Sequence, residues 1–238
     1  MEKRYDRNVR IKHIGQSGQE KLLSSSVCVI GAGGLGSASI QYLAAAGVGR
    51  LAIIDHDRVD ETNLQRQVIH NTDDLGREKV LSAAGKAFSI NPGIRIETYN
   101  MKISDDNFEE LSGSFDFVID AVDNFRAKFA INDGCVRLGK PFCHAGALAM
   151  EAQVMTYVPG SPCLRCAIPN EPEAGAYPTS LDEGILGAVA GHAGTLQAIE
   201  AVKYITGAGR LLTGRMLFID ALNARYKSVE IEKRKGCC

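Results

Sequence analysis

The chain has 238 residues, of which 45% are hydrophobic, so it can bury one substantial core and fits one α/β domain better than two small ones. Its 27 Lys and Arg residues balance 28 Asp and Glu residues, which excludes a net field that would draw the protein to nucleic acid or to an anionic membrane. The charged start MEKRYDRNVR precedes no apolar stretch of signal-peptide length, and no apolar run approaches the roughly 20 residues of a membrane span, so we expect a soluble cytoplasmic protein.

Short apolar runs alternate with longer amphipathic stretches in the first part of the chain, as is typical of repeated βα units and a mainly parallel sheet. Strands are predicted at residues 25–31, 50–55, 94–100, 115–121 and 141–147. Helices are predicted at residues 34–47, 76–91 and 124–139.

The alternation of short apolar runs and amphipathic stretches changes from about residue 150. A strand at 152–159 is followed by the loop 167–183, which is rich in Pro, Gly and acidic residues, and such long loops are often lids or binding segments. A helix at 185–207 and strands at 214–221 and 225–233 complete the chain. The pattern predicts an α/β, Rossmann-like fold with a mainly parallel sheet flanked by helices and an added C-terminal antiparallel portion. We expect one domain over the whole chain.

The segment VCVIGAGGLGSAS has the order strand, glycine loop, helix, and the loop contains Gly31, Gly33, Gly34 and Gly36. Glycine allows a tight turn and lets backbone N–H groups approach a phosphate at a helix N-terminus. Asp55 ends the second predicted strand, where an acidic side chain can bind the hydroxyls of an adenosine ribose; its alternative role is to cap the next turn. These residues predict an adenine nucleotide and leave NAD and ATP open.

Four polar residues further along favour a triphosphate. Asn63 and Arg66 are three residues apart and share one face of a helical turn, and Lys79 lies at the start of the next helix. Asp123 follows the fourth predicted strand, at the edge where ligands bind in open α/β sheets. Arg66 and Lys79 can neutralise phosphate oxygens, Asn63 can donate a hydrogen bond to them, and Asp123 can hold Mg²⁺. Each alone is typical of a solvated surface, but together with Asp55 they predict ATP and Mg²⁺.

The order and spacing of these motifs make the chain similar to the MoeB/ThiF/HesA group, bacterial relatives of the ubiquitin-activating enzymes. The motifs are RYDR (4–7), GAGGLG (31–36), Asp55, NLQRQ (63–67), Lys79, DAVDN (120–124), CLRC (163–166) and GTLQAIEAVK (194–203). The resemblance covers essentially the whole chain. It implies an adenylyltransferase that activates the C-terminal Gly-Gly carboxylate of a small ubiquitin-fold sulfur-carrier protein with MgATP and releases pyrophosphate. It also implies a nucleotide-binding half at about 1–147 and a carrier-binding half at about 148–238.

The resemblance assigns roles to individual residues. It implies that Asp55 binds ribose, that Asn63, Arg66 and Lys79 bind phosphates, and that Asp123 binds Mg²⁺. It implies a homodimer in which Arg7 reaches the nucleotide of the other subunit. A carboxylate is already a competent nucleophile toward the α-phosphorus, so Arg7, Arg66, Lys79 and Asp123 are the expected catalytic residues and no general base is needed.

One departure from the family lies in the loop before the long helix, where some members carry a cysteine and this chain has Ser180. A serine hydroxyl needs an activating base, and the loop contains neither His nor Lys. We therefore expect activation without a covalent enzyme intermediate at this loop, followed by transfer to an external sulfur donor. The pathway served by the carrier stays open between molybdopterin, thiamin, cysteine and another sulfur-containing product.

The second departure concerns zinc. Cys163 and Cys166 have the C-x-x-C spacing of half a Cys₄ zinc site, whereas the expected second pair is replaced by Cys237 and the adjacent Cys238. Adjacent cysteines chelate one metal only with strain. Three interpretations remain open: three thiolates plus an outside ligand, a lost site with free thiols, or a recorded chain that ends before the natural one.

Two other functions compete with adenylation. A Rossmann-type NAD(P)-dependent oxidoreductase would share the glycine loop and Asp55 but would leave Arg66, Lys79 and Asp123 without a purpose. A non-catalytic scaffold that only binds a carrier could lose any of these polar residues freely. The intact polar set therefore favours the enzyme.

Overall fold

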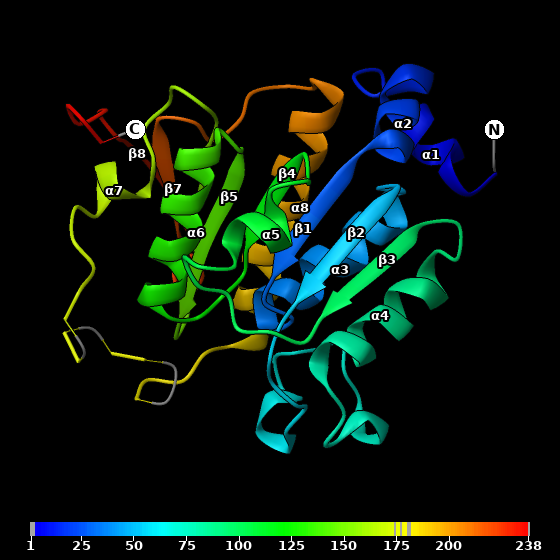
Figure 1. The fold of residues 1–238 in the computed structure, drawn as a ribbon, viewed down its shortest axis with the longest axis horizontal. Helices are drawn as coiled ribbons and strands as arrows, with labels where there is room; N and C mark the ends of the chain where they lie inside the picture. Colours follow the sequence, from blue (N-terminus) through cyan, green and yellow to red (C-terminus); the bar gives the residue numbers. More distant parts are fainter. Residues whose placement is uncertain (1–2, 174, 177, 180–181, 238) are drawn as a thin grey trace.

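The computed structural model describes residues 3–173, 175–176, 178–179 and 182–237, and Ser180 and Cys238 lie outside the described residues. Within them, one sheet has the strand order β3-β2-β1-β4-β5-β6-β7-β8 (Figure 1). The strands are β1 (Ser26–Ile30), β2 (Arg50–Ile54), β3 (Arg95–Tyr99), β4 (Phe117–Asp120), β5 (Phe142–Leu148), β6 (Glu151–Tyr157), β7 (Arg215–Asp220) and β8 (Arg225–Glu230). Neighbouring strands from β3 to β5 are parallel, and those from β5 to β8 are antiparallel. The predicted fold class is confirmed.

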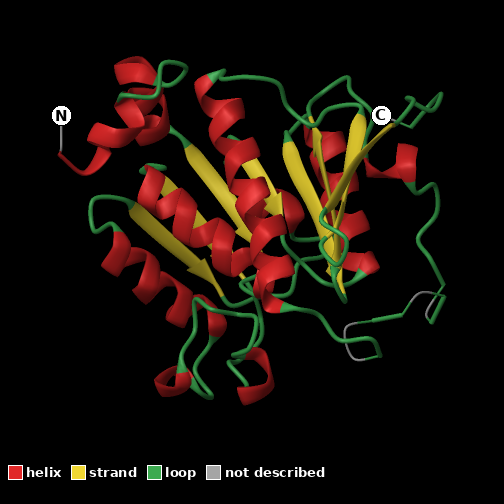
Figure 2. Ribbon diagram, turned by 180° about the vertical axis from the view of Figure 1, so that it is seen from behind, coloured by secondary structure: helices red, strands yellow, loops and turns green. Residues whose placement is uncertain are grey.

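Helices cover both faces of the sheet. One face carries α3 (Gly34–Ala46), α4 (Lys79–Ile90) and α8 (Gly187–Thr206), which lie in front of the strands in Figure 2. The other carries α5 (Phe108–Ser112), α6 (Phe125–Leu138) and α7 (Leu164–Ala167). The remaining elements are α1 (Asp6–Val9), α2 (Gly15–Ser24) and the 3₁₀ turns η1 (Lys3–Tyr5), η2 (Glu61–Asn63) and η3 (Thr72–Asp74). No helix in the described part of the chain is long and apolar enough to cross a bilayer.

Strand β1 shows how the sheet produces two cores. All five of its residues are buried. Val27 and Val29 pack in the cluster beneath α3 and α8, whereas Cys28 and Ile30 pack beneath α5 and α6, because successive side chains of a strand point to opposite faces. A parallel strand covered on both faces therefore reads as a continuous apolar run, VCVI, which is the signal that predicted it.

The predicted strands and long helices are all present, with ends that shift by a few residues. The helix expected at 76–91 starts later, at Lys79, because Gly76 has a φ of +76° and Glu78 forms a β-bridge with Arg58. The sequence interpretation did not predict α1, α2, α5 or α7, whose short sequences lack a sustained apolar period.

Candidate functional site

A cavity of about 700 Å³ lies at the carboxyl ends of β1, β2, β4 and β5, where ligands bind in open α/β sheets. One side is formed by the glycine loop, Asp55, Arg66, Lys79 and Asp123. The other is formed by the end of β5, the start of β6, Phe218 of β7 and residues of the loop before α8. The structure thus brings most of the predicted nucleotide-binding residues to one cavity that also has room for a second reactant.

The glycine loop is fixed by close backbone approaches. Gly31 has a φ of +103°, and a Cβ there would lie 2.5 Å from the carbonyl oxygen of Ala121. A Cβ on Gly36 would lie 1.9 Å from the carbonyl oxygen of Gly31. Helix α3 follows with Gly33 at its N-cap and no side-chain cap, so its first N–H groups can bind an anion, and Gly33 and Gly34 both line the cavity.

Asp55 joins the loop to the end of β2. One of its carboxylate oxygens accepts the Ala32 N–H (2.7 Å), and the other accepts the Asp57 N–H (2.9 Å). Asp55 therefore caps the following turn and faces the cavity at the same time, so the two roles considered from the sequence do not exclude each other. Each carboxylate oxygen keeps a lone pair that could accept a ribose hydroxyl.

Lys79 is the first residue of α4 and is only 5% exposed. Its Nζ lies 2.9 Å from the Asp57 carboxylate, a partner that the sequence interpretation missed. Burial alone would raise the pKa of Asp57, but the ion pair with Lys79 outweighs it and the pKa lies below its ordinary value. A buried ammonium is thus held at the cavity wall, where a phosphate oxygen can approach it.

Asn63 is the last residue of η2, and Arg66 lies in the turn that follows it. Arg66 lines the cavity, and its guanidinium donates a hydrogen bond to the carbonyl oxygen of Thr62 (3.0 Å). The Asn63 carbonyl oxygen accepts the N–H groups of Arg66 and Gln67, so the two predicted residues share one turn. Asn63 itself does not appear among the described residues that line the cavity.

Asp123 is exposed at the cavity wall beyond β4, a carboxylate position that suits Mg²⁺. Below it, the fully buried Asp120 contacts Nδ1 of His144 (2.6 Å) and Nζ of Lys128 (3.3 Å). Burial would raise the pKa of Asp120, but the Lys128 ammonium and the His144 hydrogen bond hold it below its ordinary value. Burial, together with Lys128, lowers the pKa of His144. The group is therefore a carboxylate–ammonium pair with a neutral imidazole beneath the proposed Mg²⁺ ligand.

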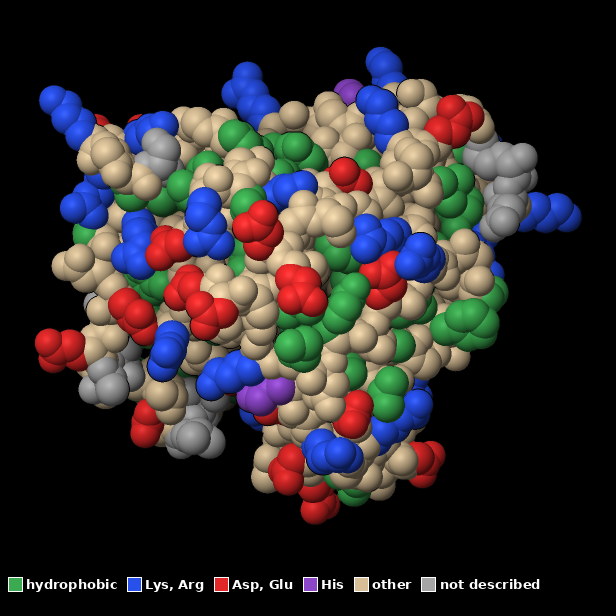
Figure 3. Space-filling view, in the orientation of Figure 1, with side chains coloured by type: hydrophobic (Ala, Val, Ile, Leu, Met, Phe, Trp, Pro, Cys, Tyr) green, Lys and Arg blue, Asp and Glu red, His purple; other side chains and the backbone are tan. Residues whose placement is uncertain are grey.

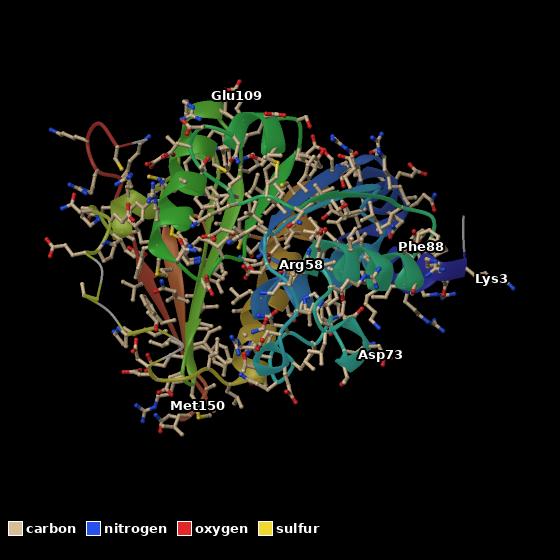
Figure 4. All side chains as sticks on the ribbon, turned by 60° about the horizontal axis from the view of Figure 1, so that its bottom comes forward. Lys3, Arg58, Asp73, Phe88, Glu109 and Met150 are labelled. Atoms are coloured by element: carbon tan, nitrogen blue, oxygen red, sulfur yellow. The ribbon has the colours of Figure 1, made fainter. Side chains whose placement is uncertain are left out.

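Arg7 lies at the opposite end of the sheet. Helix α1 is docked by Tyr5, whose hydroxyl accepts a hydrogen bond from Asn91 (2.8 Å) at the end of α4. The 13 residues of α3 span about 20 Å between that corner and the cavity. In Figure 4, Lys3 is likewise far from Met150, which lies in the turn between β5 and β6. The Arg7 side chain is 87% exposed and is not among the described residues that line the cavity of its own chain.

Three of the predicted zinc ligands come together away from this cavity. The sulfur atoms of Cys163, Cys166 and Cys237 lie within 4.8 Å of one another, and those of Cys163 and Cys237 are 3.5 Å apart. Zn–S bonds of about 2.3 Å in a tetrahedron place sulfur atoms about 3.8 Å apart, so the cluster has the dimensions of a zinc site. The Arg234 N–H also donates to the sulfur of Cys166 (3.4 Å).

The visible surface carries acidic and basic side chains interspersed on one face (Figure 3). This mixture matches the near-zero net charge of the chain, −1 at pH 7.

The strand order and the glycine loop at the N-terminus of α3 make this a Rossmann-like α/β protein, in which most of the predicted nucleotide-binding residues line one cavity. The family model described as the ThiF family matches residues 5–238. The chain therefore belongs to the ThiF family, and the resemblance inferred from the motifs is confirmed.

The chain is 42% identical over 234 residues to the SAMP-activating enzyme E1 of Haloferax volcanii, covering 98% of this chain and 87% of that protein. It is 38% identical over 240 residues to the sulfur carrier protein adenylyltransferase of Thermus thermophilus, covering 98% and 89%. It is 44% identical over 236 residues to the adenylyltransferase and sulfurtransferase MOCS3 of Arabidopsis thaliana, covering 99% of this chain but 51% of that protein. A crystal structure of E. coli MccB has the same fold, with a TM-score of 0.87 at 24% identity over 100% of this chain and 74% of that one.

Proposed function

We propose that this protein adenylates the C-terminal carboxylate of a small ubiquitin-like sulfur carrier that ends in Gly-Gly, using MgATP and releasing pyrophosphate. The observation that carries the proposal is the convergence of the glycine loop, Arg66, Lys79 and Asp123 on one cavity with space for a second reactant. The names of the relatives from Haloferax volcanii and Thermus thermophilus support the same activity. An NAD(P)-dependent oxidoreductase would have no use for the buried Lys79 ammonium or the exposed Asp123 carboxylate.

The nucleotide is oriented by groups that are already fixed. Asp55 accepts the ribose hydroxyls, and the N-terminus of α3 donates N–H groups to phosphate oxygens. The apolar side chains of Met101, Ile103 and Val122 line the same cavity and offer a surface for the adenine. Binding in this way places the α-phosphorus between the glycine loop and the open half of the cavity.

The reaction is an in-line displacement at the α-phosphorus. An oxygen of the carrier carboxylate forms a bond to this phosphorus, the bond to the bridging oxygen of the β-phosphate breaks, and its electron pair leaves with pyrophosphate. No proton moves, so Lys79 and Arg66 act by neutralising charge on the phosphate oxygens. Asp123 would hold Mg²⁺, which would supply further neutralisation of the pyrophosphate.

The carrier tail enters from the antiparallel half of the sheet. Gly146, Gln153 and Phe218 are paired in register across β5, β6 and β7, and all three line the cavity. Phe218 is 40% exposed, and Tyr226 on the neighbouring β8 is 59% exposed. These features support a path for an extended tail toward the α-phosphorus and an apolar surface outside it for the body of the carrier.

A homodimer completes the site in this proposal. The length of α3, about 20 Å, separates the corner that carries Arg7 from the cavity of its own chain, so in this proposal Arg7 acts on the nucleotide of a second copy. Tyr42, Leu81 and Phe88 are exposed apolar side chains on α3 and α4 and would be covered by such a copy.

The acyl-adenylate passes to an external sulfur donor, and the enzyme forms no covalent intermediate. Cys28, Cys135 and Cys143 are fully buried, and burial raises the pKa of each thiol, so none is a suitable nucleophile. Cys163, Cys166 and Cys237 fit a structural zinc ion and would hold it with a fourth ligand from outside the described residues.

The test is ATP–pyrophosphate exchange with candidate carriers that end in Gly-Gly. Exchange should require a carrier and should fall by about 100-fold or more in Asp123→Ala. Asp106→Ala is the matched control, because Asp106 is an exposed carboxylate outside the cavity. Absence of exchange with every carrier, combined with binding of NADH in a fluorescence titration, would overturn the assignment.

A further inference from the structure

His70 lies directly beneath the glycine loop and is 5% exposed. Its Nε2 is 2.9 Å from the carbonyl oxygen of Ala32, the residue between Gly31 and Gly33. The N–H of Ala32 donates to Asp55 at 2.7 Å. The N–H and the carbonyl oxygen of Ala32 are therefore both hydrogen-bonded, the first to the half-buried Asp55 and the second to the buried His70.

The partner of Nε2 fixes the hydrogen on that nitrogen. A carbonyl oxygen only accepts, so Nε2 carries a hydrogen and donates it to Ala32. Nδ1 lies 2.8 Å from the hydroxyl oxygen of Ser82, which also makes a hydrogen bond with the Asp74 carboxylate. Burial lowers the pKa of His70 and the charge of Lys79 adds to the lowering, whereas the Ala32 hydrogen bond and the carboxylates of Asp74 and Asp55 oppose it. The net direction is downward, so the neutral ring is the form present near pH 7.

Ser82 connects this contact to the phosphate lysine. It lies three residues after Lys79, in the first turn of α4, and is 1% exposed. His70 therefore bridges the loop whose helix N-terminus faces the phosphates and the helix that carries the buried ammonium. The imidazole thus adds a second link between the glycine loop and α4, beside the one that runs from Ala32 through Asp55 and Asp57 to Lys79.

We infer that His70 is a positioning residue of the nucleotide site, which fixes the glycine loop relative to α4 so that the N-terminus of α3 and Lys79 converge on the same phosphates. The inference rests on the proposed binding of ATP and adds a residue to it. His70 does not line the cavity within the described part of the chain, so it acts through Ala32 and Ser82 and not on the nucleotide directly.

Three variants separate this role from simple core packing. His70→Gln keeps an N–H near the position of Nε2 and can still donate to Ala32. His70→Asn is shorter and loses that donor while it stays polar near Ser82. Ser82→Ala removes the hydrogen bond to Nδ1 and leaves the contact between His70 and Ala32.

The experiment measures the Kd for ATP by calorimetry, with thermal unfolding and circular dichroism as checks of folding. His70→Asn should bind ATP about tenfold more weakly, because loss of a buried hydrogen bond leaves the Ala32 carbonyl unsatisfied, whereas His70→Gln should stay within about threefold of wild type. Ser82→Ala should fall between them. Folded His70→Asn that binds ATP as tightly as wild type, or His70→Gln that binds as weakly as His70→Asn, would overturn the inference.

Recovery of binding by the conservative variant gives a readout that packing alone would not change. The Gln and Asn variants carry the same amide group and differ in its reach, so a selective recovery of affinity in His70→Gln reports the hydrogen bond to Ala32. If His70→Asn does not fold, Ser82→Ala decides the matter: a folded Ser82→Ala that binds ATP as tightly as wild type would contradict the link between His70 and α4. Failure of the wild type to bind ATP would instead overturn the proposed function.

Discussion

The substitution Asp120→Asn removes one charge from the buried group beneath the cavity and changes almost no volume. Asp120 is 0% exposed, and its carboxylate faces the ammonium of Lys128, whose side chain is 8% exposed. The variant leaves that largely buried ammonium without its counter-charge. Removing one partner of a buried ion pair costs about 3–5 kcal/mol, so the free energy of unfolding should fall by that amount.

For a chain of this length each kcal/mol lowers Tm by about 2–4 °C, which predicts a decrease of about 6–20 °C. Urea unfolding followed by circular dichroism gives the free energy directly. Lys128→Met in the same background removes the uncompensated ammonium, so the double variant should be more stable than Asp120→Asn alone. The dependence of stability on acid pH provides a further check. Because the pKa of Asp120 is lowered in the folded state, Asp120 contributes to the free energy of unfolding at pH values above the pKa of an unfolded Asp. That contribution is lost as the pH falls through the pKa of the folded state. A loss below about 1 kcal/mol, or a double variant that is no more stable, would refute a charge-based role for this group.

Four further predictions test other parts of the molecule. Gly36→Ala should lower the free energy of unfolding by about 1–3 kcal/mol and weaken ATP binding, because its Cβ would lie 1.9 Å from the Gly31 carbonyl oxygen; equal stability and ATP affinity in calorimetry would contradict this. Arg7→Ala and Asp123→Ala should each be inactive in pyrophosphate exchange. When the two variants are mixed equally and re-equilibrated, about half of the dimers are heterodimers with one intact site of two, so roughly a quarter of the wild-type rate should return. No recovery would exclude action of Arg7 across subunits. Purified protein should contain about one zinc ion per chain by elemental analysis, and Cys163→Ser should contain none, so a metal-free wild type would refute the zinc proposal. Incubation with carrier and MgATP should give no carrier–enzyme adduct on a non-reducing gel, and an adduct that is sensitive to thiols would show that a cysteine does act as a nucleophile.

The sequence predicts the nucleotide half of the site well because its residues occur in motifs whose spacing follows from a strand, a loop and a helix. Gly31, Asp55 and Asp123 each sit at the end of a parallel strand, and parallel strands end at the same edge of a sheet. Asn63 shows the limit of such reasoning, since its spacing from Arg66 predicts a common turn but not which residue of the turn faces the cavity.

The partners of these residues could not be found in the same way. Asp57, His70, Lys128 and His144 are single polar residues, and their contacts join different elements of the fold. A buried polar side chain leaves no periodic signal of its own. Helix α2 was missed for a related reason: its sequence GQSGQEKLLS is mostly polar, and only Leu22 is a fully buried apolar side chain, so tertiary packing and not local pattern holds it.

Strand direction reverses between β5 and β6, and this reversal divides the lining of the cavity into two parts whose amino-acid sequences differ in how freely they can change. In the proposed reaction, the parallel strands present the glycine loop, the carboxylates and Lys79 in one arrangement, because the displacement at the α-phosphorus is the same for any carboxylate substrate. The β7–β8 hairpin lies at the free edge of the sheet, and all of β8 is exposed, so its side chains can change without disturbing that arrangement. Exchange of this hairpin for that of a relative should therefore change which carrier is bound and leave the proposed adenylation site unchanged.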